Sequence, residues 1–263
     1  MTRGEAVASS TFGLKSEGGV ATVVLDRPPA NAVNPTMIEE LLDELPAVIA
    51  DPAVRCVLIS GNERFFCAGA DIAVMRDLGQ ENQLAMRRWV DVQRLLELAR
   101  VPVIAAMRGH ALGGGAELSL ACDLRLLGSR ASFGFPEMTL GLFPGAGGSQ
   151  RLPRLVGSHR AKLIMIDGAQ LQPEEALRVG LVDQVVADEA FDETVADIAA
   201  RWASRPTRAI ELLKRSIESA AGLPIEQALE HEWRAVDELR ESADAAEGLQ
   251  AFLDRRDAHF EGR

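Results

Sequence analysis

The sequence predicts an α/β core that is followed by an all-helical region. Short apolar runs, such as residues 20–25 and 103–107, alternate with segments whose apolar residues recur at helical spacing, a pattern typical of parallel β-α-β units. After Asp183 the pattern changes, and from Phe191 to Phe252 only amphipathic helical segments follow. We therefore expect an α/β core over residues 1–190, with its site built by loops at the strand ends, and a helical region over residues 191–263.

Each expected element follows from local chemistry. Pro28 and Pro29 end the first strand, because proline has no backbone N–H to donate to a sheet. Trp89, Val92 and Leu96 lie on one face of a helix. The expected elements, in order, are a loose start over residues 1–15, a strand over 20–25, a helix over 37–49, strand 54–60, helix 87–99, strand 103–107, a short helix over 115–121, and short strands over 123–127 and 132–133.

The composition limits the classes of protein to which this chain can belong. Hydrophobic residues make up 47% of the 263 residues and charged residues 25%, which is ordinary for a globular chain with a sizeable core. The 28 Lys and Arg against 39 Asp and Glu give a net charge of −11. This argues against a general nucleic-acid or anionic-membrane binder, because both need a basic surface. An anionic ligand held by a few local cations and backbone amides remains compatible with that charge.

The cysteines and histidines indicate no disulfide or metal framework. Cys56, Cys67 and Cys122 are odd in number and lack metal-ligand spacing, so we expect reduced thiols and a cytoplasmic protein. The four histidines are scattered, and we expect no metal. No basic start leads into a long apolar run, and no apolar stretch approaches the roughly eighteen residues of a membrane span. We expect neither a cleaved signal nor a membrane span.

Two glutamates are the strongest candidates for chemistry. Glu117 follows three glycines in GHALGGGAE (residues 109–117), and Glu137 ends FGFPE (residues 133–137). Carboxyl groups in apolar surroundings have raised pKa values and can hold or pass a proton near neutral pH. A pair of them offers an acid and a base in one site.

The glycines before Glu117 predict exposed backbone donors. Gly113, Gly114 and Gly115 enter a helix, where the first N–H groups have no internal partner and the helix dipole favours negative charge. The loop over residues 65–71 leaves a strand and enters a helix in the same way, so two such amides could form an oxyanion hole. A tight packing turn is the alternative for each loop. Neither loop has the lysine of a P-loop or the spacing of a dinucleotide fingerprint.

Together these segments resemble the enoyl-CoA hydratase/isomerase (crotonase) superfamily. The similarity covers about residues 20–260, and its most specific segments are 66–72 (FCAGADI), 109–123 and 133–151. The resemblance implies a spiral of ββα units with a C-terminal helical region that mediates trimers, often paired into hexamers. It also implies a coenzyme A thioester as the substrate and no further cofactor.

The resemblance implies an enoyl-CoA hydratase of fatty-acid degradation. The backbone amides of Ala70 and Gly114 would hold the thioester oxygen, while Glu117 and Glu137 would manage the addition of water across a trans-2-enoyl-CoA. The main alternative is a Δ3,Δ2-enoyl-CoA isomerase or another acyl-CoA enzyme of the superfamily. A non-catalytic acyl-CoA binding protein is a further alternative, but both glutamates are retained. Nucleic-acid binding, known for an occasional relative, fits poorly with the charge of −11.

The resemblance also implies the residues that contact the substrate. Pro29 and Ala73 stand where lysines are frequent in the family, so fewer cations face the CoA phosphates, and Arg255 could replace part of that charge, or else form a solvated helix end. Candidates for an apolar acyl pocket, each equally compatible with simple core, are Met75, Leu78, Trp89, Leu140 and Leu142. The expected substrate-binding residues are Pro29, Ala30, Ala68, Asp71, Ile72, Gly113, Pro136, Leu140, Gly141 and Arg255.

Overall fold

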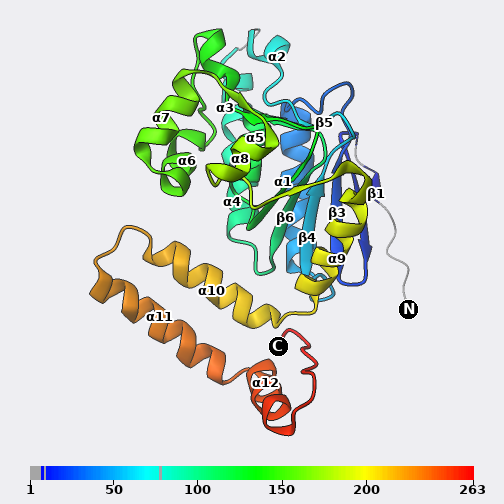
Figure 1. Cartoon of the computed structure of the whole chain (residues 1–263), viewed down its shortest axis with the longest axis vertical. Helices are drawn as coiled ribbons and strands as arrows, with labels where there is room; N and C mark the ends of the chain where they lie inside the picture. Colours follow the sequence, from blue (N-terminus) through cyan, green and yellow to red (C-terminus); the bar gives the residue numbers. More distant parts are fainter. Residues whose placement is uncertain (1–6, 9, 77–78) are drawn as a thin grey trace.

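The computed structural model describes residues 7–8, 10–76 and 79–263. Leu78 and residues 1–6 therefore lie outside the described residues. The chain forms two β-sheets with helices around them, and the last two helices, α11 (Ile225–Arg240) and α12 (Ala243–Asp254), extend away from this core (Figure 1). The fold is mixed α/β, as predicted.

The larger sheet has the order β1-β2-β3-β4-β6-β8-β11. Its strands are parallel from β3 onward, and β1–β3 are joined antiparallel. The predicted strands over residues 20–25 and 103–107 are both confirmed. The bounds are β1 Val7–Ala8, β2 Phe12–Glu17, β3 Val20–Leu25, β4 Cys56–Ser60, β6 Val103–Met107, β8 Leu124–Gly128 and β11 Gln184–Val186.

The expectation of a loose start was wrong for the part of residues 1–15 that lies in β1 and β2. β2 pairs with β3 over its whole length, through a turn at Gly18 and Gly19, both of which have positive φ. In β2 only Phe12 is buried, so the strand carries almost no apolar pattern. Its backbone hydrogen bonds to β3 stabilise it instead.

The smaller sheet has the order β10-β9-β7-β5 and consists of short strands. Three times in succession a strand of the large sheet is followed by a strand of the small sheet and then by a helix: β4 and β5, β6 and β7, β8 and β9. These repeats form the turns of the ββα spiral. The bounds are β5 Phe65–Cys67, β7 His110–Leu112, β9 Phe133–Gly134 and β10 Gln170–Leu171.

The large sheet is covered on both faces. Val57, Ile59 and Val103 belong to the main core with α1 and α4, whereas Cys56 and Leu58 pack with α9. This alternation follows from the two-residue period of a strand. The helices of the core are α1 Pro35–Ala50, α2 Ile72–Arg76, α3 Gln80–Arg87, α4 Trp89–Glu97, α5 Gly114–Ser119, α6 Gly148–Val156, α7 Ser158–Ile166, α8 Pro173–Arg178 and α9 Phe191–Ala203, with 3-10 turns η1 Pro136–Leu140 and η2 Asp188–Ala190.

Two details differ from the expected helices. The helix expected over residues 87–99 is α4, which begins at Trp89 and ends at Glu97, and Arg88 separates it from α3, which was not expected. The helical region expected from residue 191 begins with α9, which packs on the large sheet through Phe191, Val195 and Ile198. The core packing therefore continues to Ala203.

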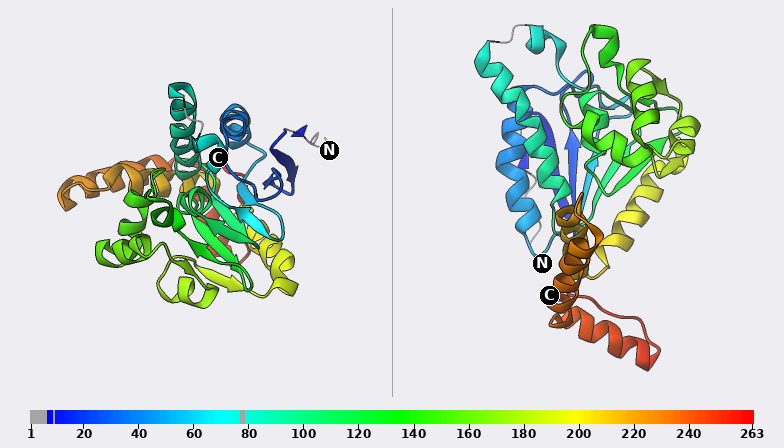
Figure 2. Two further views of the ribbon diagram at one scale, coloured as in Figure 1. Left: turned by 90° about the horizontal axis from the view of Figure 1, so that it is seen from above. Right: turned by 90° about the vertical axis from the view of Figure 1, so that its left-hand side faces the viewer.

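The last three helices follow the core, and among the described residues only the first of them packs on it, through buried Leu212 and the Lys214–Asp123 pair. They are α10 Thr207–Ala220, α11 Ile225–Arg240 and α12 Ala243–Asp254. Figures 1 and 2 show α11 and α12 extending away from the core, at the end opposite to α2 and α3. Trp233 on α11 is 61% exposed and Phe252 on α12 is 82% exposed. An apolar surface of this kind is unusual for an isolated chain. None of the helices in the described ranges has the length and apolarity needed to cross a membrane.

Candidate active site

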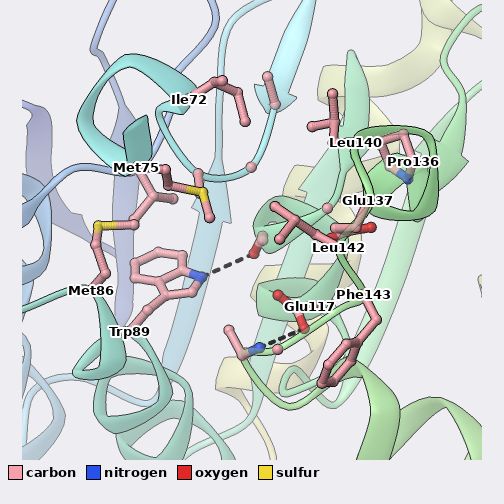
Figure 3. A pocket seen from close by; sticks show the side chains of 18 of the residues that line it. Ile72, Met75, Met86, Trp89, Glu117, Pro136, Glu137, Leu140, Leu142 and Phe143 are labelled. Carbon is pink, nitrogen blue, oxygen red and sulfur yellow. Dashed lines mark hydrogen bonds between the residues drawn. The ribbon is translucent and has the colours of Figure 1, made fainter. Parts of the chain in front are cut away.

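A cavity of about 570 Å³ opens between the loop after β5, helices α3 to α5, and the segment from η1 to Ala146. Figure 3 shows Ile72, Met75, Met86 and Trp89 on one side of it and Glu117, Glu137 and Leu142 on the other. Most of its lining side chains are apolar. The remaining lining residues are Val33, Ala68, Gly69, Ala70, Gln83, Arg87, Val90, Gly113, Gly114, Pro136, Leu140, Phe143, Gly145 and Ala146.

Glu117 is held firmly at the floor of this cavity. It lies in the first turn of α5, and it is only 3% exposed. Its Oε1 accepts hydrogen bonds of 2.9 Å from the backbone amides of Ala146 and Gly148 (Figure 3 shows the first). Burial raises the pKa of the Glu117 carboxyl, while these two amides and Arg151 act to lower it. One oxygen is thus fixed, and the carboxyl has a defined orientation.

Glu137 lies in the first turn of η1, beside the start of α5. An ideal Cβ on Gly113 would be 3.0 Å from its Oε1, and its buried Oε2 has no hydrogen-bond partner in the described part of the chain. Burial raises the pKa of Glu137 to about 7, and the nearby charge of Glu117 adds to this rise. A carboxyl group with this pKa can carry a proton at neutral pH.

Two backbone amides lie together at the same cavity. An ideal Cβ on Gly114 would be 3.6 Å from the amide nitrogen of Ala70, and one on Gly69 would be 2.9 Å from the amide nitrogen of Gly114. Gly69 has φ +93°, so both the space and the backbone require glycine there. Among the described residues, neither the Ala70 nor the Gly114 amide donates a hydrogen bond. Both donors are therefore available to a ligand oxygen.

Arg151 packs against the loop over residues 146–148, which holds Glu117. Its guanidinium donates to Glu97 at 3.0 Å and to the Oε1 of Gln93 at 2.7 Å. An ideal Cβ on Gly147 would collide with this guanidinium, and Gly147 has φ +104°. Gly147, between the two amides that bind Glu117, is consequently packed against the partly buried ion pair of Arg151 and Glu97. Neither Arg151 nor Gly147 was expected to have this role.

The structure brings most of the predicted site residues to one cavity. Met75, Trp89 and Leu142 also line it, as expected for an acyl pocket. The glycine-rich segments and the two glutamates within them predicted the centre of the site. Nothing in the sequence predicted that Met86, Arg87 and Phe143 would line the cavity. The predicted residues at the cavity are Glu117, Glu137, Ala70, Gly114, Ala68, Ile72, Gly113, Pro136 and Leu140.

Five predicted contacts do not line the cavity. Asp71 pairs with Arg27 at 2.8 Å, and its other oxygen caps α2 by accepting from the amide of Ala73. Arg255 follows α12, at the opposite end of the molecule from α2 (Figure 1). The others are Pro29, Ala30 and Gly141. Substrate contacts by these five residues stay predictions.

The similarity to known proteins covers nearly the whole chain. The sequence model of the enoyl-CoA hydratase/isomerase family matches residues 15–263. The chain belongs to this family. A crotonyl-CoA hydratase of Syntrophomonas wolfei is 40% identical over 94% of this chain and 96% of its own length. A short-chain-enoyl-CoA hydratase of Clostridium acetobutylicum is 38% identical over 92% of this chain and 94% of its own length.

A solved structure confirms the family fold. The enoyl-CoA hydratase of Bacillus anthracis superposes with a TM-score of 0.92 at 35% identity, over 97% of this chain and 100% of that one. The ββα spiral predicted from the resemblance is thus confirmed. Within the described residues, no group of three or more His, Cys, Asp or Glu side chains is arranged to hold a metal ion.

Proposed function

We propose that this member of the enoyl-CoA hydratase/isomerase family is an enoyl-CoA hydratase. It adds water syn across the double bond of a trans-2-enoyl-CoA and yields a 3-hydroxyacyl-CoA, as in fatty-acid degradation. The hydratase names of the relatives at 38–40% identity support this reaction. The observation that carries it is the meeting of two carboxyl groups and two free amides at one largely apolar cavity.

The two amides would activate the thioester toward attack by water. The thioester oxygen would accept hydrogen bonds from the N–H groups of Ala70 and Gly114. As water attacks C3, negative charge develops on that oxygen, and fixed donors in an apolar cavity stabilise it without reorganising. Removing one such donor typically slows a reaction by about a hundred- to a thousandfold.

The two carboxyl groups would act as the base and the acid of the reaction. Glu117, whose Oε1 is held by the amides of Ala146 and Gly148, orients the water with its other oxygen and takes its proton. Glu137, with a pKa raised to about 7, holds the same water and delivers a proton to C2. The hydroxyl group goes to C3, the proton goes to C2, and no redox partner is needed. Because these two proton transfers complete the reaction, we propose that it needs no cofactor beyond the CoA thioester.

The reaction is tested by following the loss of enoyl absorbance with crotonyl-CoA as substrate. Wild-type protein should hydrate it, and Glu117→Gln should lower kcat by about a hundred- to ten-thousandfold, because a general base typically contributes that factor. The variant Glu193→Gln, on the exposed start of α9, serves as the control. Hydration at the wild-type rate by Glu117→Gln would reject the role given to Glu117.

Isomerisation of a 3-enoyl-CoA to a 2-enoyl-CoA is the second candidate, since it needs the same amides. The presence of both carboxyl groups at the cavity favours hydration, because isomerisation moves one proton and needs no oriented water. Product analysis separates the two reactions. A 2-enoyl substrate that yields the 3-hydroxyacyl ester reports hydration, whereas a 3-enoyl substrate that yields the 2-enoyl ester reports isomerisation.

We also propose a homotrimer, or a hexamer formed from two trimers, as the working assembly. The exposed apolar side chains of α11 and α12, including Trp233 and Phe252, support burial against another copy. Arg255 would then contact the CoA phosphates of a neighbouring subunit, since it lies far from its own cavity. Light scattering of the wild type and of Trp233→Glu tests the assembly. A wild-type mass of a single chain would reject it.

The compartment that we propose is the cytoplasm. Its support is chemical: Cys56, Cys67 and Cys122 are all free and buried. Burial raises the pKa of each of these thiols to about 12, so they stay protonated and unreactive.

A further inference from the structure

One wall of the cavity combines apolar side chains with an arginine. Gln83, Met86 and Arg87 of α3 line it, and Trp89 and Val90 of α4 continue the same wall. Residues 83 and 87 are four apart on a helix, so they share one face. Figure 3 shows Met86 and Trp89 across the cavity from Glu137 and Leu142.

Arg87 differs from its neighbours in that it pairs with no charged side chain among the described residues. Arg88 lies 3.9 Å from Asp91, and Arg94 forms a 2.6 Å bond with Glu97. Over the described ranges, Arg87 takes part in no ion pair or side-chain hydrogen bond. A guanidinium group offers a planar pair of donors that matches a carboxylate.

The surroundings favour an anion that enters with the substrate. The cavity's own carboxyl groups, Glu117 and Glu137, are used in the proposed reaction and lie on the other side. Arg87 is exposed, so an incoming anion can reach it, and its neighbours Met86, Trp89 and Val90 in the lining are apolar. A ligand that covers this wall would exclude water, and the attraction between a guanidinium and a carboxylate would then be less weakened. A wholly hydrocarbon acyl chain would leave this donor pair unused.

We propose that Arg87 selects 2-enoyl-CoA esters whose acyl chain ends in a carboxylate. This inference rests on the proposed hydratase function and names its substrate class. The thioester oxygen lies at the amides of Ala70 and Gly114, the double bond lies beside the glutamates, and the chain runs along Met86 and Trp89 to the guanidinium. The competing source of an anion is a phosphate of CoA itself.

Steady-state kinetics distinguish the two sources. The ratio of kcat/KM for trans-2-hexenedioyl-CoA to that for trans-2-hexenoyl-CoA is measured in wild type, Arg87→Gln and Arg88→Gln. We expect the ratio to fall by roughly ten- to a hundredfold in Arg87→Gln, the usual effect of losing a charge-assisted bond, and to stay constant in Arg88→Gln. An equal loss for both esters would indicate a CoA phosphate and overturn the proposal, and an unchanged ratio would overturn it as well.

Binding of unreactive esters separates this inference from the reaction. Adipyl-CoA and hexanoyl-CoA lack the double bond, so their dissociation constants, measured by calorimetry, are independent of hydration. Wild type should bind adipyl-CoA more tightly, and Arg87→Gln and high salt should each remove that preference. If the preference is present but no enoyl ester is hydrated, the reaction is wrong and the role of Arg87 stands. Equal affinity of wild type for the two esters would overturn the role of Arg87, whether or not hydration occurs.

Discussion

The indole N–H of Trp89 donates a hydrogen bond of 3.0 Å to the carbonyl oxygen of Gly114. This bond joins α4, on the acyl side of the cavity, to the residue whose own amide we assign to the thioester oxygen (Figure 3). Trp89 is 2% exposed, so the bond is shielded from water. The ring therefore has two roles, as a wall of the cavity and as a tether for the start of α5.

Trp89→Phe should lower kcat for crotonyl-CoA by about three- to tenfold. The phenyl ring retains most of the packing, but the buried carbonyl of Gly114 loses a donor worth about 1 kcal/mol. The measurement is kcat together with the unfolding midpoint in urea. A loss of stability with unchanged kcat would show that the tether is structural only.

Glu137→Gln should reduce hydration of crotonyl-CoA by about a hundred- to ten-thousandfold. The amide keeps the shape of the carboxyl group but cannot donate a proton to C2. Initial rates of loss of enoyl absorbance give the comparison, and Glu193→Gln again serves as the control. An unimpaired rate in Glu137→Gln would contradict the assigned role.

The stability of the fold should depend on pH through Glu137. Its folded pKa is raised from the ordinary 4.5 to about 7, so the favourable protonated form is fully present below pH 4.5 and is lost as the pH rises through 7. Relative to Glu137→Gln, wild type should lose about 1–2 kcal/mol of unfolding free energy between about pH 5 and pH 8, after discounting for partial exposure. Urea unfolding at one protein concentration checks this. A pH-independent difference would refute the raised pKa.

Gly148→Ala should impair hydration more strongly than folding. A Cβ at this position would lie 2.9 Å from the Oε1 of Glu117 and 2.9 Å from the Cβ of Pro144, so the loop and the carboxyl group must shift. Displacing a catalytic group by about 1 Å can cost a hundredfold in rate. Gly13→Ala is the control, since nothing lies within 4 Å of its added Cβ. Equal rates in the two variants would contradict the tight packing around Glu117.

Arg255→Gln should raise KM for CoA esters by roughly three- to tenfold if Arg255 binds a phosphate of a neighbouring subunit's substrate. The salt dependence of KM should weaken in the same variant. Arg256→Gln is the matched control, because Arg256 is already paired with Glu247 at 2.6 Å. A KM that is independent of salt in wild type would exclude an important Arg255 contact.

Some elements could not be predicted from their own residues. β2 has one buried side chain and is stabilised by its hydrogen bonds to β3. Helix α3 (Gln80–Arg87) is mainly polar in sequence and packs against α1 and α4. In both cases the decisive interactions come from a neighbouring element, which local periodicity does not record.

The alternation of strands and helices, the family and the two glutamates among glycines could all be predicted from the residues, because apolar periodicity and the backbone freedom of glycine are local properties. Three features could be found only in the folded chain. Glu117 is held by the amides of Ala146 and Gly148, the buried Oε2 of Glu137 has no partner among the described residues, and Arg87 lines the same cavity. A pKa or an ion pair depends on desolvation and on charges that segments distant in the chain bring together through space.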